Sequence, residues 1–336
     1  MSKFLAPIEA VMLLLLFGSC DTSVNLSAPF MPRLVVYSVL TTVSDTQYVR
    51  VYTTYNSSVN SSSNGQEGTS VTDAQVTITR QDGSTIAFQP TVIEYRDSSG
   101  SLNSVAAYRA YPFRPDAGKQ YVLTVSSPTY GVVAATSTIP EQGSIEPVNR
   151  SVLGNPFNIK SDFGFKAALS PEALGYLGQL YIEYLRPLPD GTYQTKRLEI
   201  PVNRDTIGVE LKIIRKFYPQ PRRRSTSANA SSMVDGLIQY TEGIPYSWGA
   251  YVVELRALFD TEGDNIKFSK AIFYLIQFDA PLWKYWNISN GFNDRYSIRL
   301  DDPTYTNITG GVGLLGSVRV DSLVIPLPER LPHPAQ

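Results

Sequence analysis

The stretch that decides the fold is LVVYSVLTTVSDTQYVRVYTTY, residues 34–55. It contains two runs, LVVYSVL at 34–40 and YVRVYTTY at 48–55, that are rich in β-branched and aromatic residues and follow a period of two. AQVTITR at 74–80 repeats the pattern. Because side chains alternate between the two faces of a strand, these runs predict β-strands.

The same signal continues toward residue 140. Further strands are predicted at 105–111, 121–126 and 132–138, with the turn sequences QDG and DAG between strands. Six or seven short strands in about 110 residues are typical of an antiparallel β-sandwich, here of an Ig-like or carboxypeptidase-regulatory-like kind. We therefore predict a β-sandwich domain at 33–140, followed by a linker at 141–157 that contains Gly and Pro and few paired apolar positions.

The second part, residues 158–328, is predicted to be a β-rich α+β domain with one helix. Strands are expected at 163–169, 180–186, 193–202 and 250–258, a closing strand or hairpin at 312–325, and a polar tail at 329–336.

The single amphipathic helix is expected at about 264–279. Apolar residues recur there at spacings of three or four, namely Phe268, Ile272, Leu275 and Ile276. Pro281 should kink or end this helix. Trp283 and Trp286 follow directly, and we expect them to wedge the helix against a sheet rather than stack on a ligand.

The amino terminus has the features of a lipoprotein signal. Lys3 supplies a positive start, an apolar stretch follows at residues 10–17, and Gly18 and Ser19 precede Cys20. An apolar run of about eight residues is far short of the ~20 that span a bilayer. The sequence therefore predicts removal of residues 1–19, acylation of Cys20, a tether at 20–32, and a lipid-anchored protein of the cell envelope. The alternative is a buried amino-terminal helix or a short membrane anchor.

Composition excludes several classes of function. Lys plus Arg is 29 and Asp plus Glu is 30, so the net charge of −1 provides no basic field to gather nucleic acid. The chain has one Cys, Cys20, and one His, His333, each near an end. An intrachain disulfide, a Cys-rich zinc site and a His-dependent triad are thereby disfavoured. We expect no cofactor and no resident metal.

Two carboxylates are the least implausible catalytic pair. Glu183 and Glu254 lie in strand-like segments beside aromatic residues, and a glycosidase needs two carboxylates across a cleft. Arg186 and Arg256 each lie within three residues of one of them, so ion pairing on strands is the simpler interpretation. The sequence accordingly predicts no catalytic residue, and we expect a protein that is not an enzyme.

The strongest local charge feature is KIIRKFYPQPRRR at 212–224, which holds six of the 29 basic residues. These could contact anionic lipid headgroups or an acidic partner, whereas the alternative is a solvated loop. The six candidates are Lys212, Arg215, Lys216, Arg222, Arg223 and Arg224.

Two shorter patterns also have alternative interpretations. Asp-Thr-Ile and Asp-Ser-Leu resemble bacterial O-glycosylation acceptors, which makes Thr206 and Ser322 candidate sites. GGVG at 310–313 lacks the ending of a phosphate-binding loop, so its glycines are expected to permit a bulge or close backbone approach at the start of a strand.

Several segments together carry a family resemblance. They are a lipoprotein Cys, PRLVVYSVLT at 32–41, VTDAQVTITRQDG at 71–83, AGKQYVLTVSSPTYGVVAATSTIP at 117–140 and TNITGGVGLLGSVRVDSLVIP at 306–326. The chain resembles the uncharacterised bacterial lipoprotein family called domain of unknown function four-two-four-nine. That family brings no established activity. The resemblance implies a non-enzymatic accessory role at the outer membrane beside a TonB-dependent transporter, on either its periplasmic or its surface face.

A second class of function remains open. The chain has 21 Tyr residues, and tyrosines combine a large apolar ring with a polar tip. A shallow groove lined by exposed aromatic residues would favour a glycan-binding surface lipoprotein, whereas burial of those rings would count against it.

Overall fold

The computed structural model describes residues 31–54, 68–96, 100–207, 210–214, 220–222, 231–234, 237–290 and 305–332. Within them the chain is mainly β, which confirms the predicted fold class. The first part contains β1 (Leu34–Thr41), β2 (Gln47–Thr53), β3 (Gln75–Arg80), β4 (Thr85–Arg96), β5 (Leu102–Ala110), β6 (Gln120–Ser127) and β7 (Gly131–Thr138). The runs predicted as strands at 34–40, 48–55 and 74–80 thus overlap the observed strands β1, β2 and β3.

The second part adds strands and three helices within the described residues. They are β8 (Ser144–Val148), α2 (Ser151–Gly154), β9 (Phe163–Leu169), β10 (Ala173–Pro187), β11 (Tyr193–Ile200), β12 (Asn203–Ile207), β13 (Glu210–Ile214), β14 (Gln220–Pro221), β15 (Ser231–Val234), β16 (Leu237–Tyr246), α3 (Trp248–Glu262), β17 (Lys267–Asp279), α4 (Ala280–Asn290) and β18 (Val312–Pro326).

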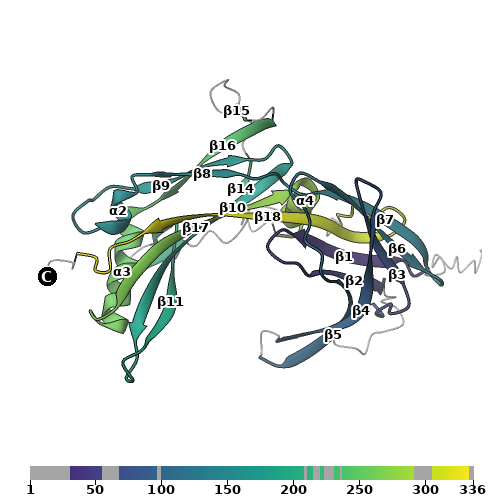
Figure 1. Cartoon of the computed structure of the whole chain (residues 1–336), viewed down its shortest axis with the longest axis horizontal. Coiled ribbons are helices and arrows are strands. Elements are labelled where there is room, and N and C mark those ends of the chain that lie inside the picture. Colours follow the sequence, from purple (N-terminus) through teal and green to yellow (C-terminus); the bar gives the residue numbers. More distant parts are fainter. Residues whose placement is uncertain are drawn as a thin grey trace, which may run out of the picture.

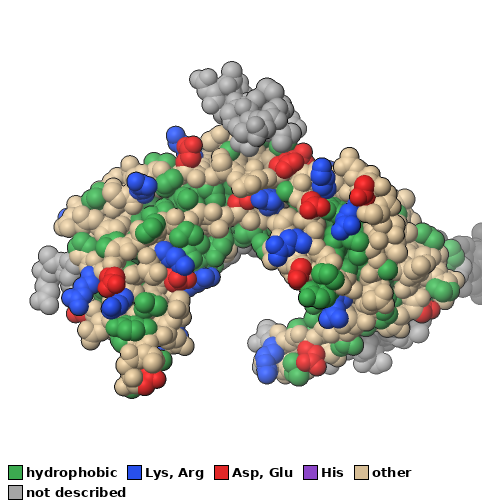
Figure 2. Space-filling model, in the orientation of Figure 1, with side chains coloured by type: hydrophobic (Ala, Val, Ile, Leu, Met, Phe, Trp, Pro, Cys, Tyr) green, Lys and Arg blue, Asp and Glu red, His purple; other side chains and the backbone are tan. Residues whose placement is uncertain are grey.

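One large sheet runs through both parts. Its strand order is β11-β10-β17-β18-β1-β2-β5-β4-β3-β6-β7, with β14 also paired to β10, and β15-β16-β9-β8 form a smaller sheet. Figure 1 shows two lobes joined by the long strand β18. Figure 2 shows the molecule hollowed on one side, between the lobe that ends in β11 and the β4–β5 hairpin.

The strand β18 belongs to both lobes. Residues 312–318 pair in parallel with β1, and residues 318–326 pair antiparallel with β17. Leu315 is buried in the core built by β1 to β7, whereas Leu323 and Ile325 pack against the core of the other lobe. The last strand of the chain therefore joins two hydrophobic cores.

The helix predicted at about 264–279 is wrong, because this segment is the strand β17. Ala271, Phe273 and Leu275 face the core at every second position. β17 lies between β10 and β18, and residues on its other face are half-buried as well. A strand that is apolar on both faces also contains apolar residues three or four apart, so spacing alone cannot distinguish it from a helix.

The strand predicted at 250–258 is also wrong, because these residues lie in helix α3. The Oγ of Ser247 accepts a hydrogen bond from the backbone N–H of Ala250 at the start of the helix, and Gly263 follows its last residue with φ +77°. Ser before a helix and Gly after it are the ordinary boundary signals. They were available in the sequence and outweigh the β-branched content of the segment.

Pro281 begins a helix rather than ending one. It is the second residue of α4, where the lack of an N–H costs no hydrogen bond. The ring of Trp283 lies where a Cβ on Gly175 of β10 would be. This confirms that Trp283 wedges a helix against the sheet, although the helix is α4.

A buried carboxylate fixes the start of α4. The Asp279 carboxylate accepts hydrogen bonds from the Ser137 hydroxyl on β7, at 2.6 Å, and from the backbone N–H of Leu282, at 2.9 Å. Burial raises the pKa of Asp279 above its usual range, although these hydrogen bonds act in the opposite direction. Asp279 thus connects the end of β17 to the first lobe.

Asp279→Asn should change how stability depends on pH. The Asp279 carboxyl has a higher pKa in the folded state than in the unfolded state, so the folded state binds its proton more tightly. This carboxyl therefore favours folding at pH values below its unfolded pKa, and that contribution is lost as pH rises through its folded pKa. Asn keeps the helix cap and cannot ionise. We expect the stability of the variant, relative to the wild type, to increase as pH rises above about 3.9, the usual pKa of an Asp carboxyl. Thermal unfolding at several pH values measures this, and a constant difference would contradict it.

Candidate binding groove

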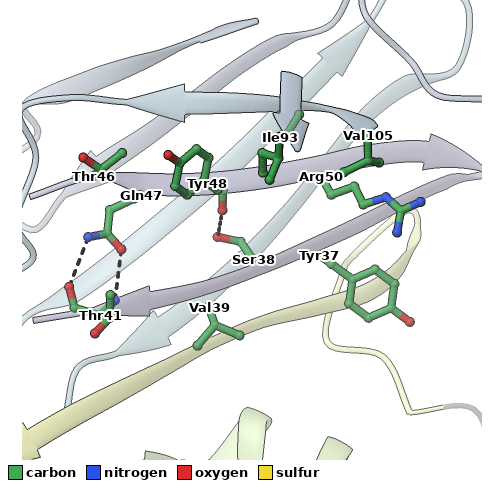
Figure 3. A pocket seen from close by; sticks show the side chains of 11 residues that line it. Tyr37, Ser38, Val39, Thr41, Thr46, Gln47, Tyr48, Arg50, Ile93 and Val105 are labelled. Carbon is green, nitrogen blue, oxygen red and sulfur yellow. Dashed lines mark hydrogen bonds between the residues drawn. The ribbon is translucent and has the colours of Figure 1, made fainter. Parts of the chain in front are cut away.

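The candidate site is a groove between the sheet and the β4–β5 hairpin. β5 pairs with β2 only between residues 108–110 and 47–49, whereas its pairing with β4 continues out to Leu102. The hairpin therefore diverges from the sheet and leaves a cavity of about 280 Å³. We call this cavity the tyrosine groove (Figure 3); it is lined by Tyr37, Ser38, Val39, Thr41, Thr46, Gln47, Tyr48, Arg50, Ile93, Val105 and Ala107.

Strand alternation places these side chains. On β1, Val36 and Leu40 are buried in the core, whereas Tyr37 and Val39 lie on the opposite face. β2 shows the same alternation, and Tyr48 is 43% exposed. The aromatic and charged residues of the lining therefore lie on the outer face of a sheet whose inner face forms the core, whereas the buried Ser38 and Gln47 occupy core-facing positions of the two strands.

The polar groups of the lining are largely satisfied within the protein. The Ser38 hydroxyl donates to the carbonyl of Tyr48 at 2.9 Å. The Gln47 amide donates to the carbonyls of Thr41 and Ser44, at 3.1 and 2.9 Å, and accepts from the N–H of Thr41 at 3.0 Å. Figure 3 shows these bonds within the wall of the groove, apart from the one to Ser44. A ligand therefore meets mainly apolar surface.

An aromatic cluster forms one end of the groove. Tyr37 stacks on Tyr52, with centroids 6.1 Å apart, and meets the ring of Tyr285 from α4 edge to face at 5.8 Å. The Arg50 guanidinium lies 4.9 Å from the centroid of Tyr52. Burial raises the pKa of Tyr37, so its hydroxyl stays protonated at neutral pH. Among the described residues of the lining, Arg50 alone is charged.

The sequence contained a signal for this groove that the prediction did not use. Tyr37, Tyr48, Arg50 and Tyr52 occupy positions that alternate with the core residues of the first two strands. Alternation therefore places them on one face, but only the structure brings the hairpin and Tyr285 beside them.

The predicted basic contact is described only in part. Arg222 donates to the carbonyl of Pro171 at 2.7 Å, and its guanidinium lies 3.9 Å from the ring centroid of Tyr240. Lys212 lies in β13, whose side chains are not described. Arg215, Lys216, Arg223 and Arg224 lie outside the described residues. Contact of this segment with an anionic surface stays a prediction.

The predicted modification sites are placed to differing degrees. Cys20 lies outside the described residues. Thr206 lies in β12, whose side chains are not described, and Ser322 is exposed on β18. Acylation and O-glycosylation stay predictions. No helix in the described ranges combines the length and apolar character that a membrane crossing requires.

The two carboxylates considered as a catalytic pair lie in different kinds of secondary structure. Glu183 on β10 forms ion pairs with Arg197 at 3.3 Å and Lys270 at 3.1 Å. Arg186, the partner suggested by sequence proximity, instead pairs with Glu262 at 2.8 Å. Glu254 lies on helix α3 and is buried. Cross-strand neighbours, rather than chain neighbours, therefore neutralise Glu183.

The fold and the groove define a mainly β protein with an open, largely apolar surface site. Residues 21–183 match the family described as Domain of unknown function (DUF4249), which confirms the predicted family over that part of the chain. No curated protein matches the sequence. One similar solved structure is the C-terminal globular domain of an oligosaccharyltransferase from Pyrococcus abyssi, with 10% identity and a TM-score of 0.22. The match covers 71% of this chain and 45% of that one, and a likeness of this size says nothing about function.

Proposed function

We propose that this protein is a non-enzymatic accessory lipoprotein of the outer membrane, anchored through an acylated Cys20, and that it docks a segment of a TonB-dependent transporter in the tyrosine groove. The observation that carries the docking proposal is the lining itself, which is apolar and aromatic with a single positive charge. Tyr and Arg are the residue types enriched in the cores of protein interfaces. The anchor and the transporter come from the amino-terminal signal and from the family resemblance.

The internal hydrogen bonds favour a protein segment over a sugar. A glycan presents many hydroxyl groups that lose water on binding and need partners in the site. Ser38 and Gln47 already use their polar atoms within the wall of the groove. Apolar side chains of a partner would lose nothing by covering this surface, because burial of apolar area is favourable.

The contacts of Glu183, one of the two carboxylates considered as a catalytic pair, support the proposal that the protein is not an enzyme. Glu183 is held between Arg197 and Lys270, so its charge is balanced within the sheet. Each of its two carboxylate oxygens contacts a cation of the protein, so the group is engaged within the sheet rather than free to meet a substrate.

Val39→Arg is expected to abolish docking. Val39 is 42% exposed in the groove, so Arg fits without disturbing the core and adds a second positive charge to a lining that already contains Arg50 and that the partner must cover. With the acylated protein as bait in detergent-solubilised membranes, the wild type should recover one TonB-dependent receptor at near-stoichiometric yield. We expect at least a tenfold lower recovery with the variant, or about 1.4 kcal/mol.

The matched control for this experiment is Val132→Arg. Val132 is 63% exposed on β7 and is not part of the lining, so the same chemical change should leave recovery of the receptor unaltered. Equal recovery with both variants would exclude the groove as the docking site, and a wild-type bait that recovers no receptor would refute the accessory role.

A glycan-binding function is the second candidate, favoured by the open ring of Tyr48. Sugars stack their apolar faces on such rings. A glycan array with the wild type and Tyr48→Ala separates the two functions, because glycan binding requires a signal on the array that the variant loses.

A further inference from the structure

The strand β18 has one fully paired edge and one half-paired edge. β17 pairs with it from Val318 to Pro326, and β1 pairs with the opposite edge only from Val312 to Val318. Beyond that point, in the described part of the chain, no backbone hydrogen bond reaches the second edge along residues 319–325. Along these seven residues of the central sheet, the backbone N–H and C=O groups that point away from β17, those of every second residue, are therefore unpaired at an edge, and such a row is a template for another strand.

Three other strand edges of the described chain are protected. β8 contains Pro147, which lacks a backbone donor, β11 carries Lys196, and β7 is bridged to Thr309. These are the usual devices against edge pairing. The open segment RVDSLVI of β18 contains neither Lys nor Pro.

The charged residues of the open segment also do not protect its edge from pairing with another strand. The Arg319 guanidinium is paired with the Asp321 carboxylate at 2.9 Å, and both side chains are mostly buried. The Asp321 carboxylate also accepts hydrogen bonds from Gly143 and Gln277. Neither charge therefore projects along the edge to repel an incoming strand.

We propose that a second copy of this chain occupies the open edge, with the two β18 strands pairing antiparallel about a two-fold axis at Ser322. Only one antiparallel register lets all seven residues, 319–325, pair with the same seven residues of a second copy. That register sets Val320 opposite Val324 of the second copy, Asp321 opposite Leu323, and Arg319 opposite Ile325. β-branched cross-strand pairs are favourable, and no two like charges lie directly opposite each other.

The length of the edge fits a second copy of the chain. In this register Pro326 of one copy lies opposite Val318 of the other, where pairing with β1 begins. Each strand thus stops where the neighbouring β1 starts. Val324, at 51% exposed, and Ser322, also exposed, gain cross-strand neighbours. A two-fold contact of this kind closes on itself and gives a dimer rather than a fibre.

A single cysteine at the axis tests the register. Cys20 is the only Cys of the chain, so a Cys20→Ser protein with Ser322→Cys carries one thiol. Directly opposite strand residues have Cα atoms about 4.5 to 5.5 Å apart, within the range for a disulfide. With oxidised glutathione we expect Ser322→Cys to form disulfide-linked dimers at least tenfold faster than the control Ser104→Cys, an exposed position on β5. Equal rates would overturn the proposed register.

Sedimentation equilibrium over a concentration series tests the dimer without cysteines. The Cys20→Ser protein should show a monomer–dimer equilibrium. Val324→Lys, which places a charge opposite Val320 of the second copy, should abolish it, whereas Val92→Lys on β4, a site 63% exposed, should not. A protein that stays monomeric at all concentrations would overturn the proposal and leave the edge to a strand of another protein. This result is independent of the tyrosine groove.

Discussion

Gly313→Ala should lower the free energy of unfolding by about 3–5 kcal/mol, the sum of a backbone strain and a clash that cannot relax. Gly313 has φ +115°, which L side chains rarely adopt. A Cβ at this position would meet the backbone carbonyl of Val36 on β1. The substitution should therefore push β18 away from β1 along the junction of the two lobes, and denaturant unfolding measures the loss.

Gly83→Ala is the control that separates strain from clash. Gly83 also has a positive φ, +83°, but a Cβ added there would have no other atom within 4 Å. Only the backbone strain applies, so we expect a loss of about 1–2 kcal/mol. If the two variants lost the same stability, close approach of β18 to β1 would not be the reason for glycine at 313.

Gln277→Leu should cost about 3 kcal/mol or more, because it removes three hydrogen bonds of a buried side chain, one of them to the carboxylate of Asp321. Gln277 is fully buried on β17. Its side-chain oxygen accepts from the N–H of Ser170 at 2.8 Å, and its amide donates to the carbonyl of Glu141 at 3.2 Å and to Asp321 at 3.0 Å. Thermal and denaturant unfolding should both show the loss.

The control for this prediction is Gln194→Leu on the edge strand β11, where the side chain is exposed. Exposed substitutions away from special features usually change stability by no more than about 0.5 kcal/mol. A comparable loss in both variants would show that the strand preference of Leu, rather than the buried network, determines the result.

Prediction from the sequence succeeded best in the first lobe. Its strands have one face in the core and one toward solvent, so β1 and β2 show period two in their residue types as well as in their burial. GGVG was also interpreted correctly, because close backbone approach at Gly313 is what the structure contains. Local chemistry was sufficient wherever one strand face differed clearly from the other.

Prediction from the sequence failed for residues 250–279. A strand was predicted where helix α3 lies, and a helix was predicted where strand β17 lies. β17 carries apolar residues on a face that lies in the core and on a second face that is half-buried, so its periodicity could not distinguish a strand from a helix. The capping signals Ser247 and Gly263 were the better guide to α3. Burial on two faces is a property of the assembled sheet, which a window of neighbouring residues does not contain.

The sequence by itself determined that the chain is mainly β, that it resembles a domain family of unknown function, and that Cys and His chemistry is scarce. Only the tertiary structure decided where surfaces for binding lie. Tyr37 and Tyr285 are separated by more than 200 residues, yet their rings meet at the end of the tyrosine groove, and β18 joins β1 from the opposite end of the chain. Such contacts depend on how distant strands pair, and strand pairing is set by the burial of whole faces rather than by local residue preference.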